Sequence, residues 1–424
     1  YHIMYRNIDT YNPATGRFLL ENSPEARNAF LRKYEYANTD WFKTLFRPSL
    51  TQNHTLSLSG GSENATIYSS LGFFVDPGWS IADKLHRITG NIKTSYNLSS
   101  KVKIGVLAQG SIRNQKAPGT FSRSGNVVTG EYNRNFDINP FSYALNTSRA
   151  LRPYDDNGDY DYYRMNYAPM NILKELKNNY IDLKVMEYKL QGDLEVKFTP
   201  EFKYKFLGSV RYVKSTNEHS ITEQSNVVGA YRANDNMIIG ERNPFLYKDP
   251  NNPSQLPQVV LPNGGIYKLD ENDLQSYYLR NAFEYNKTLK DEEMRELHAL
   301  KFFLGQEFRY TDRDNQYFEG YGYQFNRGGV VFTEPLMLQK VIGDNSQYFD
   351  KSFSRERGVA FFSQASYGYR NRYILAGTLN YEGTNQLGRS RSARWLPTWN
   401  ISGRWNASNE RYLEGKHTLS NLSF

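Results

Sequence analysis

The chain of 424 residues contains no cysteine, and nowhere does it hold a run of the roughly eighteen apolar residues that a membrane-spanning helix needs. Without cysteine there is no disulfide framework and no thiolate metal site. The mean hydropathy is low, at −0.71. A transmembrane β-barrel is not excluded, because its strands alternate apolar and polar residues and the average conceals the apolar half.

The residue spacings that mark common enzymes are also missing. The six histidines show neither H-x-x-x-H nor H-E-x-x-H spacing, and no G-x-S-x-G or G-K-[ST] motif occurs. The net charge is +8, but the cations alternate along predicted strands and do not cluster as in a nucleic-acid site. We therefore expect a protein that is not an enzyme, with no catalytic residue, no metal, no cofactor and no nucleic-acid partner.

What is abundant is aromatic residues, at 15% of the chain, and an alternation of period two. Over residues 188–198 one face is apolar and the other carries lysine, glutamine, aspartate and glutamate; a turn at 199–201 leads into a second such stretch, 202–212. Strands of about eleven residues match a tilted transmembrane strand. The side chains expected to face lipid in the first stretch are Leu190, Leu194 and Val196.

The alternation recurs and predicts about eleven or twelve antiparallel strands. Short turns are expected at 60–64, 99–100, 199–201, 287–296 and 370–372, and long connections near 114–179, 214–272 and 311–357. Short turns on one rim and long loops on the other are typical of an outer-membrane barrel. A soluble all-β protein, with its aromatic side chains packed across strands, is the alternative that the pattern alone leaves open.

Several motifs resemble one known family. Asn38-Thr39-Asp40-Trp41 is followed by Thr51-Gln52-Asn53-His54 and by Leu56-Ser57-Leu58-Ser59-Gly60-Gly61; Tyr68-Ser69-Ser70-Leu71-Gly72 comes next. A late hairpin runs through Phe361 to Leu379, and Pro397-Thr398-Trp399 follows it. In this order the motifs resemble the barrel of the SusC/RagA family of TonB-dependent outer-membrane transporters.

The resemblance implies an all-β fold: about half of a roughly 22-stranded transmembrane antiparallel barrel with long extracellular loops. We expect residues 1–50 to lead from a plug domain into the barrel and residues 51–424 to form part of its wall. The plug, a TonB-contacting segment and a signal peptide are expected before Tyr1, and further strands after Phe424. The implied location is the bacterial outer membrane.

The implied function is TonB-dependent import of a large nutrient, either an oligosaccharide or a peptide, under a SusD-like lipoprotein lid. TonB would act through the plug. Two alternatives stay open: a barrel with a structural or secretion role, and a soluble all-β glycan-binding protein. The loop residues expected to touch the lid or the ligand are aromatic: Tyr154, Tyr160, Tyr162, Tyr163, Tyr167, Tyr231, Phe245 and Tyr247.

Two polar clusters suggest further contacts. The acidic stretch 155–161 offers oxygen ligands for calcium, but Asn157-Gly158 within it favours a type I′ turn. Arg389, Arg391 and Arg394 form a basic cluster, for which the phosphates of outer-membrane lipid or lipopolysaccharide are the expected partner.

Overall fold

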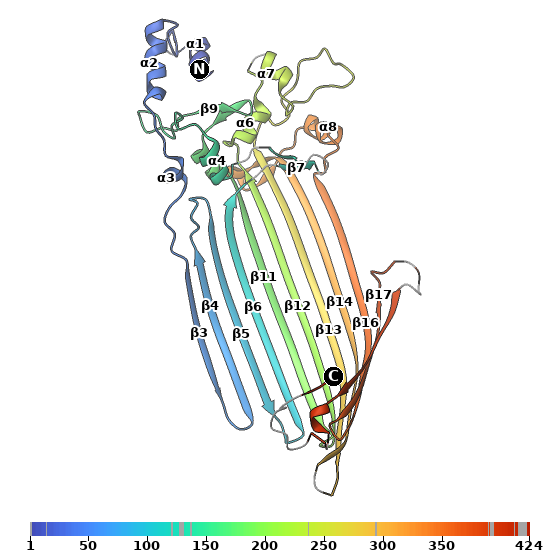
Figure 1. The fold of residues 1–424 in the computed structure, drawn as a ribbon. Helices are drawn as coiled ribbons and strands as arrows, with labels where there is room; N and C mark the ends of the chain where they lie inside the picture. The colour runs from blue at the N-terminus through green and yellow to red at the C-terminus, as the bar shows by residue number, and fades with distance from the viewer. Residues whose placement is uncertain are drawn as a thin grey trace.

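A computed structural model describes residues 2–13, 15–119, 122–126, 131–135, 138–235, 237–292, 295–388, 390, 394–410, 412–413 and 422–424. Its main body is one antiparallel sheet of twelve strands, in which eleven follow one another in the order β18-β17-β16-β14-β13-β12-β11-β6-β5-β4-β3 and β15 pairs with β14 (Figure 1). The predicted strand count is thereby confirmed. No described helix is long and apolar enough to cross a membrane.

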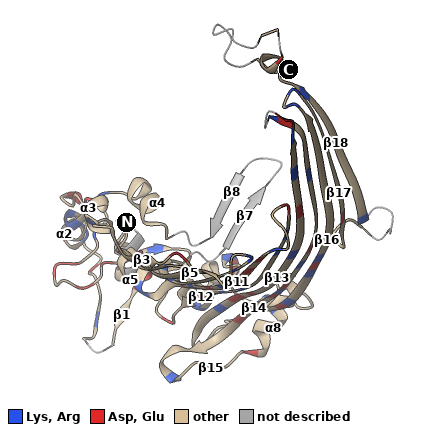
Figure 2. Cartoon of the chain, turned by 90° about the horizontal axis from the view of Figure 1, so that it is seen from below, with Lys and Arg blue, Asp and Glu red and all other residues tan. Residues whose placement is uncertain are grey.

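The sheet strands are long and joined mostly as hairpins. Their bounds are β3 Gln52–Gly61, β4 Ala65–Asp76, β5 Lys84–Asn97, β6 Val102–Pro118, β11 Asn179–Lys197, β12 Phe202–Ile221, β13 Gly265–Lys290, β14 Glu296–Gln324, β15 Val330–Val331, β16 Phe349–Tyr369, β17 Tyr373–Thr384 and β18 Trp395–Trp405. Seen along the strands, the sheet curves into an open trough (Figure 2). Right-handed strand twist and tilt produce such curvature in barrel walls.

The strand register gathers the apolar residues on one face. Leu194 lies opposite Ile104 of β6 and Phe206 of β12, and directly opposed residues share a face. The same face continues through Phe283 and Leu304 farther along the sheet. Leu190, Leu194 and Val196 all lie on this apolar face, as the alternation predicts.

Aromatic side chains border the apolar face at both ends. A row through Tyr188 and Tyr212 marks one border, and Phe198 stacks on Phe202 at the other, with ring centroids 5.5 Å apart. Tyr188 and Phe198 are ten positions apart, which is about 33 Å along the strand, or about 25 Å across a bilayer at the usual tilt. That height matches a hydrocarbon band with aromatic girdles.

Three predicted loops are shorter than the sequence suggested. The strands that flank them run on, so that the connections are 119–178, 222–264 and 325–348 rather than 114–179, 214–272 and 311–357. In β14, both faces are polar beyond the aromatic border, at 312–316. The hydrophobic period therefore stops while the hydrogen-bonded ladder continues.

All the helices except short 3₁₀ turns lie at one end of the sheet, with the long connections; we call this end the loop rim and the other end the turn rim (Figure 1). The helices are α1 His2–Asp9, α2 Pro24–Glu35, α3 Trp41–Leu45, α4 Pro140–Asn146, α5 Ile172–Asn178, α6 Asn226–Arg232, α7 Met237–Arg242 and α8 Pro335–Gly343. Short strand pairs accompany them: β1 Tyr11–Asn12 with β2 Arg17–Phe18, β7 Ser122–Asn126 with β8 Glu131–Asn135, and β9 Tyr163–Met165 with β10 Ala168–Met170.

Two buried clusters hold the loop rim together. The first cluster joins α3, α4 and α5 through Trp41, Leu45, Ile138, Tyr143, Ala144, Met170, Ile172, Leu173 and Leu176. The second joins α6 and α8 to the ends of β12, β13 and β14 through Ile221, Val227, Val228, Ala230, Tyr231, Val260, Leu261, Ile266, Tyr321, Met337 and Val341. The structure's apolar core therefore sits in the rim and not in the sheet, whose apolar face is open.

Candidate functional site

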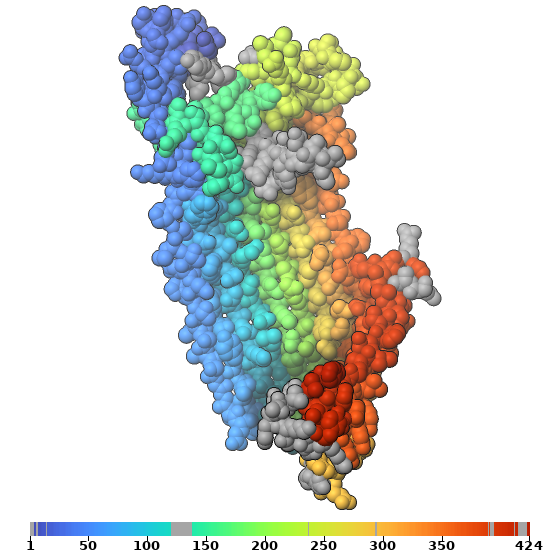
Figure 3. Space-filling model, viewed as in Figure 1, coloured from blue at the N-terminus to red at the C-terminus, as the bar shows by residue number. Residues whose placement is uncertain are grey.

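The loop rim carries a pocket of about 820 Å³. Its walls come from three parts of the chain that Figure 3 shows standing together above the sheet: the N-terminal segment, the connection 119–178 and the connection 222–264. Tyr160, Tyr162, Tyr163, Lys174 and Glu223 are among the residues that line it. Aromatic faces beside ionic and hydrogen-bonding groups are the usual composition of a ligand site, and we call this cavity the rim pocket.

The predicted tyrosines of the first loop are held in specified positions. The rings of Tyr154 and Tyr160 stack, with centroids 5.6 Å apart, and the Tyr160 hydroxyl accepts a hydrogen bond of 2.7 Å from Lys177 Nζ. The ammonium of Lys174 lies 5.1 Å from the ring centre of Tyr162, within cation–π range. These pairs limit the rotamers of the rings at the pocket wall.

Tyr163 and Tyr167 are anchored by their surroundings. Tyr163 packs against the α3–α4–α5 cluster, and burial raises the pKa of its hydroxyl. Asn166 and Tyr167 both have positive φ, 52° and 67°, and form the two-residue turn between β9 and β10. The Tyr167 hydroxyl donates a 2.8 Å hydrogen bond to the carbonyl of Arg242. An aromatic residue in this backbone region is unusual, and the hydrogen bond helps to hold it there.

Tyr231, Phe245 and Tyr247 lie elsewhere. Tyr231 is buried, its ring centroid is 5.2 Å from that of Phe245, and both Phe245 and Tyr247 pack against the α6–α8 cluster. The structure thus brings Tyr160, Tyr162 and Tyr163 to one pocket. Tyr154 stacks on Tyr160, and Tyr167 contacts Arg242. Tyr231, Phe245 and Tyr247 instead contribute to the packing of the α6–α8 cluster. A ligand or partner role for the eight residues stays a prediction.

The acidic turn is tied to α2 by an ionic cluster. Arg152 contacts Asp156 at 2.7 Å and Asp161 at 3.2 Å, and Lys33 of α2 lies 3.4 Å from Asp156. The Tyr34 hydroxyl donates to Asp161, and burial with that neighbouring carboxylate raises the pKa of Tyr34 to about 12. Hydrogen bonds from Arg152 and Lys33 lower the pKa of Asp156.

The expected type I′ turn at Asn157-Gly158 is wrong. Of the two residues only Gly158 has positive φ, 87°, whereas a type I′ turn needs both. The Asp155 carboxylate instead accepts hydrogen bonds from the backbone of Asn157 and Asp159, at 2.8 and 3.0 Å. Asp155 thus forms the turn, whereas Asp156 pairs with Arg152 and Lys33, and Asp161 binds Arg152 and Tyr34.

Asn226 joins the two long connections. Its side-chain amide donates to the carbonyls of Met165, Ala168 and Pro169 at 2.9, 3.2 and 3.1 Å. Its backbone N–H donates to Glu175 at 2.6 Å. Asn226 is only 4% exposed, so these bonds cannot be replaced readily by water. The two connections form a single unit, which we call the rim junction.

Glu175 is a buried carboxylate in this junction. Its second oxygen accepts a hydrogen bond from Asn179, whose own oxygen contacts His219. Burial raises the pKa of Glu175, and the hydrogen bonds from Asn226 and Asn179 and the charge of Lys174 act in the opposite direction. Because the pKa is higher in the folded state, this group favours the junction below its ordinary pKa and ceases to do so as the pH rises through the raised value.

Sequence reasoning missed Asn226 and Glu175. One signal was present: Glu175 interrupts the apolar spacing of Ile172, Leu173 and Leu176 in α5, and a charge on the apolar face of a helix needs a buried partner. No comparable signal marks Asn226, because its acceptors are carbonyl groups 57 to 61 residues away along the chain.

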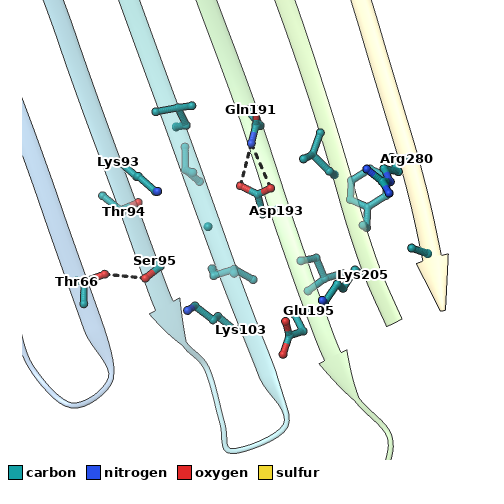
Figure 4. A pocket seen from close by; sticks show the side chains of 18 of the residues that line it. Thr66, Lys93, Thr94, Ser95, Lys103, Gln191, Asp193, Glu195, Lys205 and Arg280 are labelled. Carbon is teal, nitrogen blue, oxygen red and sulfur yellow. Dashed lines mark hydrogen bonds between the residues drawn. The ribbon is translucent and has the colours of Figure 1, made fainter. Parts of the chain in front are cut away.

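A second pocket, of about 770 Å³, opens on the polar face of the sheet near the turn rim. Figure 4 shows its polar lining on β4, β5, β6, β11, β12 and β13, with Thr66 and Ser95 hydrogen-bonded to each other and Gln191 to Asp193. Lys205 pairs with Glu284 at 2.7 Å. Both signs of charge alternate along this wall, so that it has no preference for one sign of ligand. In the part of the chain that the structure describes, no group of three or more acidic or histidine side chains could hold a metal ion.

The basic cluster suggested by sequence is only partly described. Arg389 and Arg391 lie outside the described residues, and Arg394 donates to the carbonyl of Gly388 at 3.0 Å.

Comparison with known proteins gives consistent relatives, although no family model matches the sequence. The chain is 21% identical over 398 residues to the TonB-dependent receptor SusC of Bacteroides thetaiotaomicron, covering 91% of this chain and 34% of that protein. It is 20% identical to the TonB-dependent receptor P3 of Formosa agariphila, over 93% of this chain and 34% of that protein. The chain thus spans about a third of the length of the curated relatives it matches.

Solved structures agree in fold. A structure of the RagAB peptide importer in its closed-closed state superposes with a TM-score of 0.61 at 18% identity, covering 89% of this chain and 36% of that one. A second RagAB structure, in the open-open state, gives 0.60. The relatives are receptors and transporters and not enzymes. The apolar face, the two rims and these comparisons identify the chain as a stretch of outer-membrane β-barrel wall that is similar to the TonB-dependent receptor SusC and, in fold, to the RagAB importer.

Proposed function

We propose that the protein containing this chain imports a large nutrient, an oligosaccharide or a peptide, across the outer membrane in a TonB-dependent manner. The observation that carries the proposal is the division of the sheet into an apolar outer face and a polar concave face below a rim pocket. The wall satisfies backbone hydrogen bonds inside lipid, and the rim holds aromatic and ionic side chains where a ligand would first meet the protein. TonB would act on a plug domain.

The orientation is part of the proposal: the loop rim faces the outside and the turn rim the periplasm. Because the chain has no cysteine, single thiols can report on it. Asn157 and Ser100 are both exposed, one at each rim. In intact cells a membrane-impermeant maleimide should label the Asn157→Cys protein and not the Ser100→Cys protein, whereas both should react after lysis. Labelling of Ser100→Cys alone in intact cells would reverse the orientation.

A SusD-like lipoprotein lid over the loop rim is the second part. The family resemblance implies such a partner, and the RagAB importer, to which the chain is similar, is named for two components. The connections 119–178 and 222–264 are far longer than strand joining requires. Their rigid junction offers a preformed surface, which lowers the entropic cost of binding.

Substitution of rim-pocket tyrosines tests the import role. In the full-length protein, Tyr160→Ala with Tyr162→Ala should lower uptake about tenfold or more, because stacking and cation–π contacts at the pocket wall are lost. Uptake of a dextrin oligosaccharide mixture and of a tryptic peptide digest should be measured in parallel. Tyr36→Ala is the matched control: Tyr36 lies on the same rim and is 81% exposed.

The outcomes separate the alternatives. Loss of dextrin uptake alone indicates an oligosaccharide importer, and loss of peptide uptake alone a peptide importer. If uptake of neither cargo depends on these tyrosines and no lipoprotein is retained on extraction in mild detergent, a structural or secretion role of the barrel explains the results better than import. Uptake is compared only for variants that are as abundant in the outer membrane as the unaltered protein.

A further inference from the structure

Among the residues that the structure describes, two ionic side chains of the rim pocket have no partner of opposite charge. Five ionic residues line the pocket: Asp155, Asp161, Arg164, Lys174 and Glu223. Lys174 and Glu223 are both partly buried, and neither forms an ion pair with any described residue. They reach the pocket from different connections, Lys174 on α5 and Glu223 just before α6. We call these two residues the pocket charges.

The other three ionic residues of the pocket are engaged inside the protein. Asp161 belongs to the ionic cluster with α2, in which two cations meet two carboxylates. Arg164 lies 3.9 Å from Asp235 and donates to the carbonyl of Tyr167 at 3.0 Å. The Asp155 carboxylate accepts two backbone hydrogen bonds within its own turn. A ligand therefore meets the pocket charges as the ionic groups that still lack a partner.

The charged neighbours of the pocket charges bind elsewhere. Glu175 follows Lys174 in α5, but its carboxylate accepts its hydrogen bonds inside the rim junction, and the Lys174 ammonium lies over the ring of Tyr162. The charge of Glu223 acts on Arg232, yet the Arg232 guanidinium donates to two backbone carbonyl groups, at 2.8 and 2.7 Å. One pocket thus presents both signs of charge, and the two do not cancel by contact.

The rim junction fixes the spacing of the pocket charges. Thr222, next to Glu223, donates to Asn178 twice, from its backbone N–H at 2.8 Å and from its hydroxyl at 2.6 Å. Asn178 lies one turn beyond Lys174 in α5 and donates to the Lys174 carbonyl at 2.9 Å. The backbones of Lys174 and Glu223 are therefore on the order of 10 Å apart on one rigid frame. Preset positions lower the entropic cost of binding a ligand.

We propose that Lys174 and Glu223 are specificity-determining residues of the rim pocket, which select a cargo segment that carries a carboxylate and a cationic group close together. The Lys174 ammonium binds the carboxylate, and the Glu223 carboxylate binds the cation through charge-assisted hydrogen bonds. Three extended residues of a peptide span about 10 Å, so that either its termini or its side chains can supply the two charges. The inference rests on the proposed import function and names the class of its cargo.

The same two residues disfavour other cargo. A neutral oligosaccharide would leave two partly buried charges without a counter-charge, which costs binding free energy. A polyanion or a polycation would satisfy one of the pocket charges and be repelled by the other, which is the usual way in which a site rejects a wrong ligand. A peptide with charges of both signs avoids both penalties.

The test measures binding to the purified full-length protein in a non-ionic detergent by isothermal titration calorimetry. The probe is a hexapeptide of alanine, blocked at both termini, in which one glutamate and one lysine are separated by a single residue. Lys174→Gln and Glu223→Gln should each weaken its binding about tenfold. A neutral analogue, with glutamine in place of the glutamate and the lysine, should bind the unaltered protein weakly and be affected less than about twofold by either substitution.

Matched controls separate charge pairing from general effects on the rim. Lys43→Gln and Glu35→Gln remove one charge of each sign from exposed positions on the same rim that do not line the pocket, and each should change affinity less than about twofold. The exchanged variant Lys174→Glu with Glu223→Lys should bind the probe within about fivefold of the unaltered protein, because the peptide can bind in the reverse direction. Without such recovery, the losses come from packing against Tyr162 and the proposal is wrong.

Two further ligands identify the source of the charges. Trialanine with free termini, compared with acetylated and amidated trialanine, shows whether the termini suffice. Dependence on Lys174 and Glu223 for trialanine assigns the charges to the termini, and dependence for the blocked hexapeptide alone assigns them to side chains. Either result supports the proposal.

Equal affinity for the charged probe and its neutral analogue overturns the proposal, as does binding of maltohexaose that is tighter than binding of the probe. In the latter case the import function stands, with an oligosaccharide as cargo. Unchanged uptake of both cargoes in the protein with Tyr160→Ala and Tyr162→Ala contradicts the import function instead. Because uptake by cells and binding by the purified protein are measured separately, the two failures are distinguishable.

Discussion

Leu194→Arg is expected to destabilise the inserted protein by about 2–4 kcal/mol, the cost of arginine at the midplane of the lipid-facing side of a barrel. Leu194 lies on the apolar face, opposite Ile104 and Phe206. It is six residues from Tyr188 and four from Phe198, so that neither border is close enough for the guanidinium to reach easily. The urea midpoint of the full-length protein in phosphatidylcholine vesicles measures the effect.

Gln191→Arg is the matched control, since it adds the same side chain to the same strand. Gln191 lies on the polar face and its amide donates to Asp193 at 3.3 Å. An arginine there meets water and a carboxylate, and its cost should be below about 1 kcal/mol. Equal penalties at the two positions would mean that the apolar face is not in contact with lipid.

The sheet is the part of this molecule that sequence determines most directly. The alternation at 188–198 and 202–212 fixes which side chains share a face, because a shift by one residue would reverse every one of them. The register of Leu190 with Val210 and of Leu194 with Phe206 follows that pattern. Turn positions at 99–100 and 199–201 are equally local, since they depend on a few adjacent residues.

Strand ends and rim contacts depend on information that is not local. Asp312 and Asp314 lie on the outer face of β14 with no apolar neighbour in the alternation. The alternation of apolar and polar residues therefore does not predict that this segment is a strand. The strand nevertheless continues as a hydrogen-bonded ladder with β16, across which Arg355 pairs with Asp312. The aromatic loop residues are similar in composition, yet Tyr162 lines the rim pocket and Tyr231 is buried. Only the packing of distant segments separates them.

Deletion of a long connection would be a poor test of the rim, because the rim junction ties the connections together. Substitution of a single side chain is a more specific test of the rim. Asn226→Ala is expected to cost about 2–4 kcal/mol of local stability, because it leaves the carbonyls of Met165, Ala168 and Pro169 without this donor in a buried place. The sheet has its own hydrogen-bonded ladder and should keep its stability.

Hydrogen exchange of the full-length protein can resolve this local opening. Backbone amides of 163–178 and 222–233 should exchange about 30-fold to 1,000-fold faster in Asn226→Ala, the factors that correspond to that free energy, while the amides of β11 and β12 below the aromatic border should be unchanged. Asn234→Ala is the matched control: Asn234 is an exposed amide of the same connection, and its side chain donates a 3.2 Å hydrogen bond to the carbonyl of Pro257. If Asn226→Ala exchanges like this control, the two connections are independent, and a preformed surface for a lid or a ligand cannot be attributed to their junction.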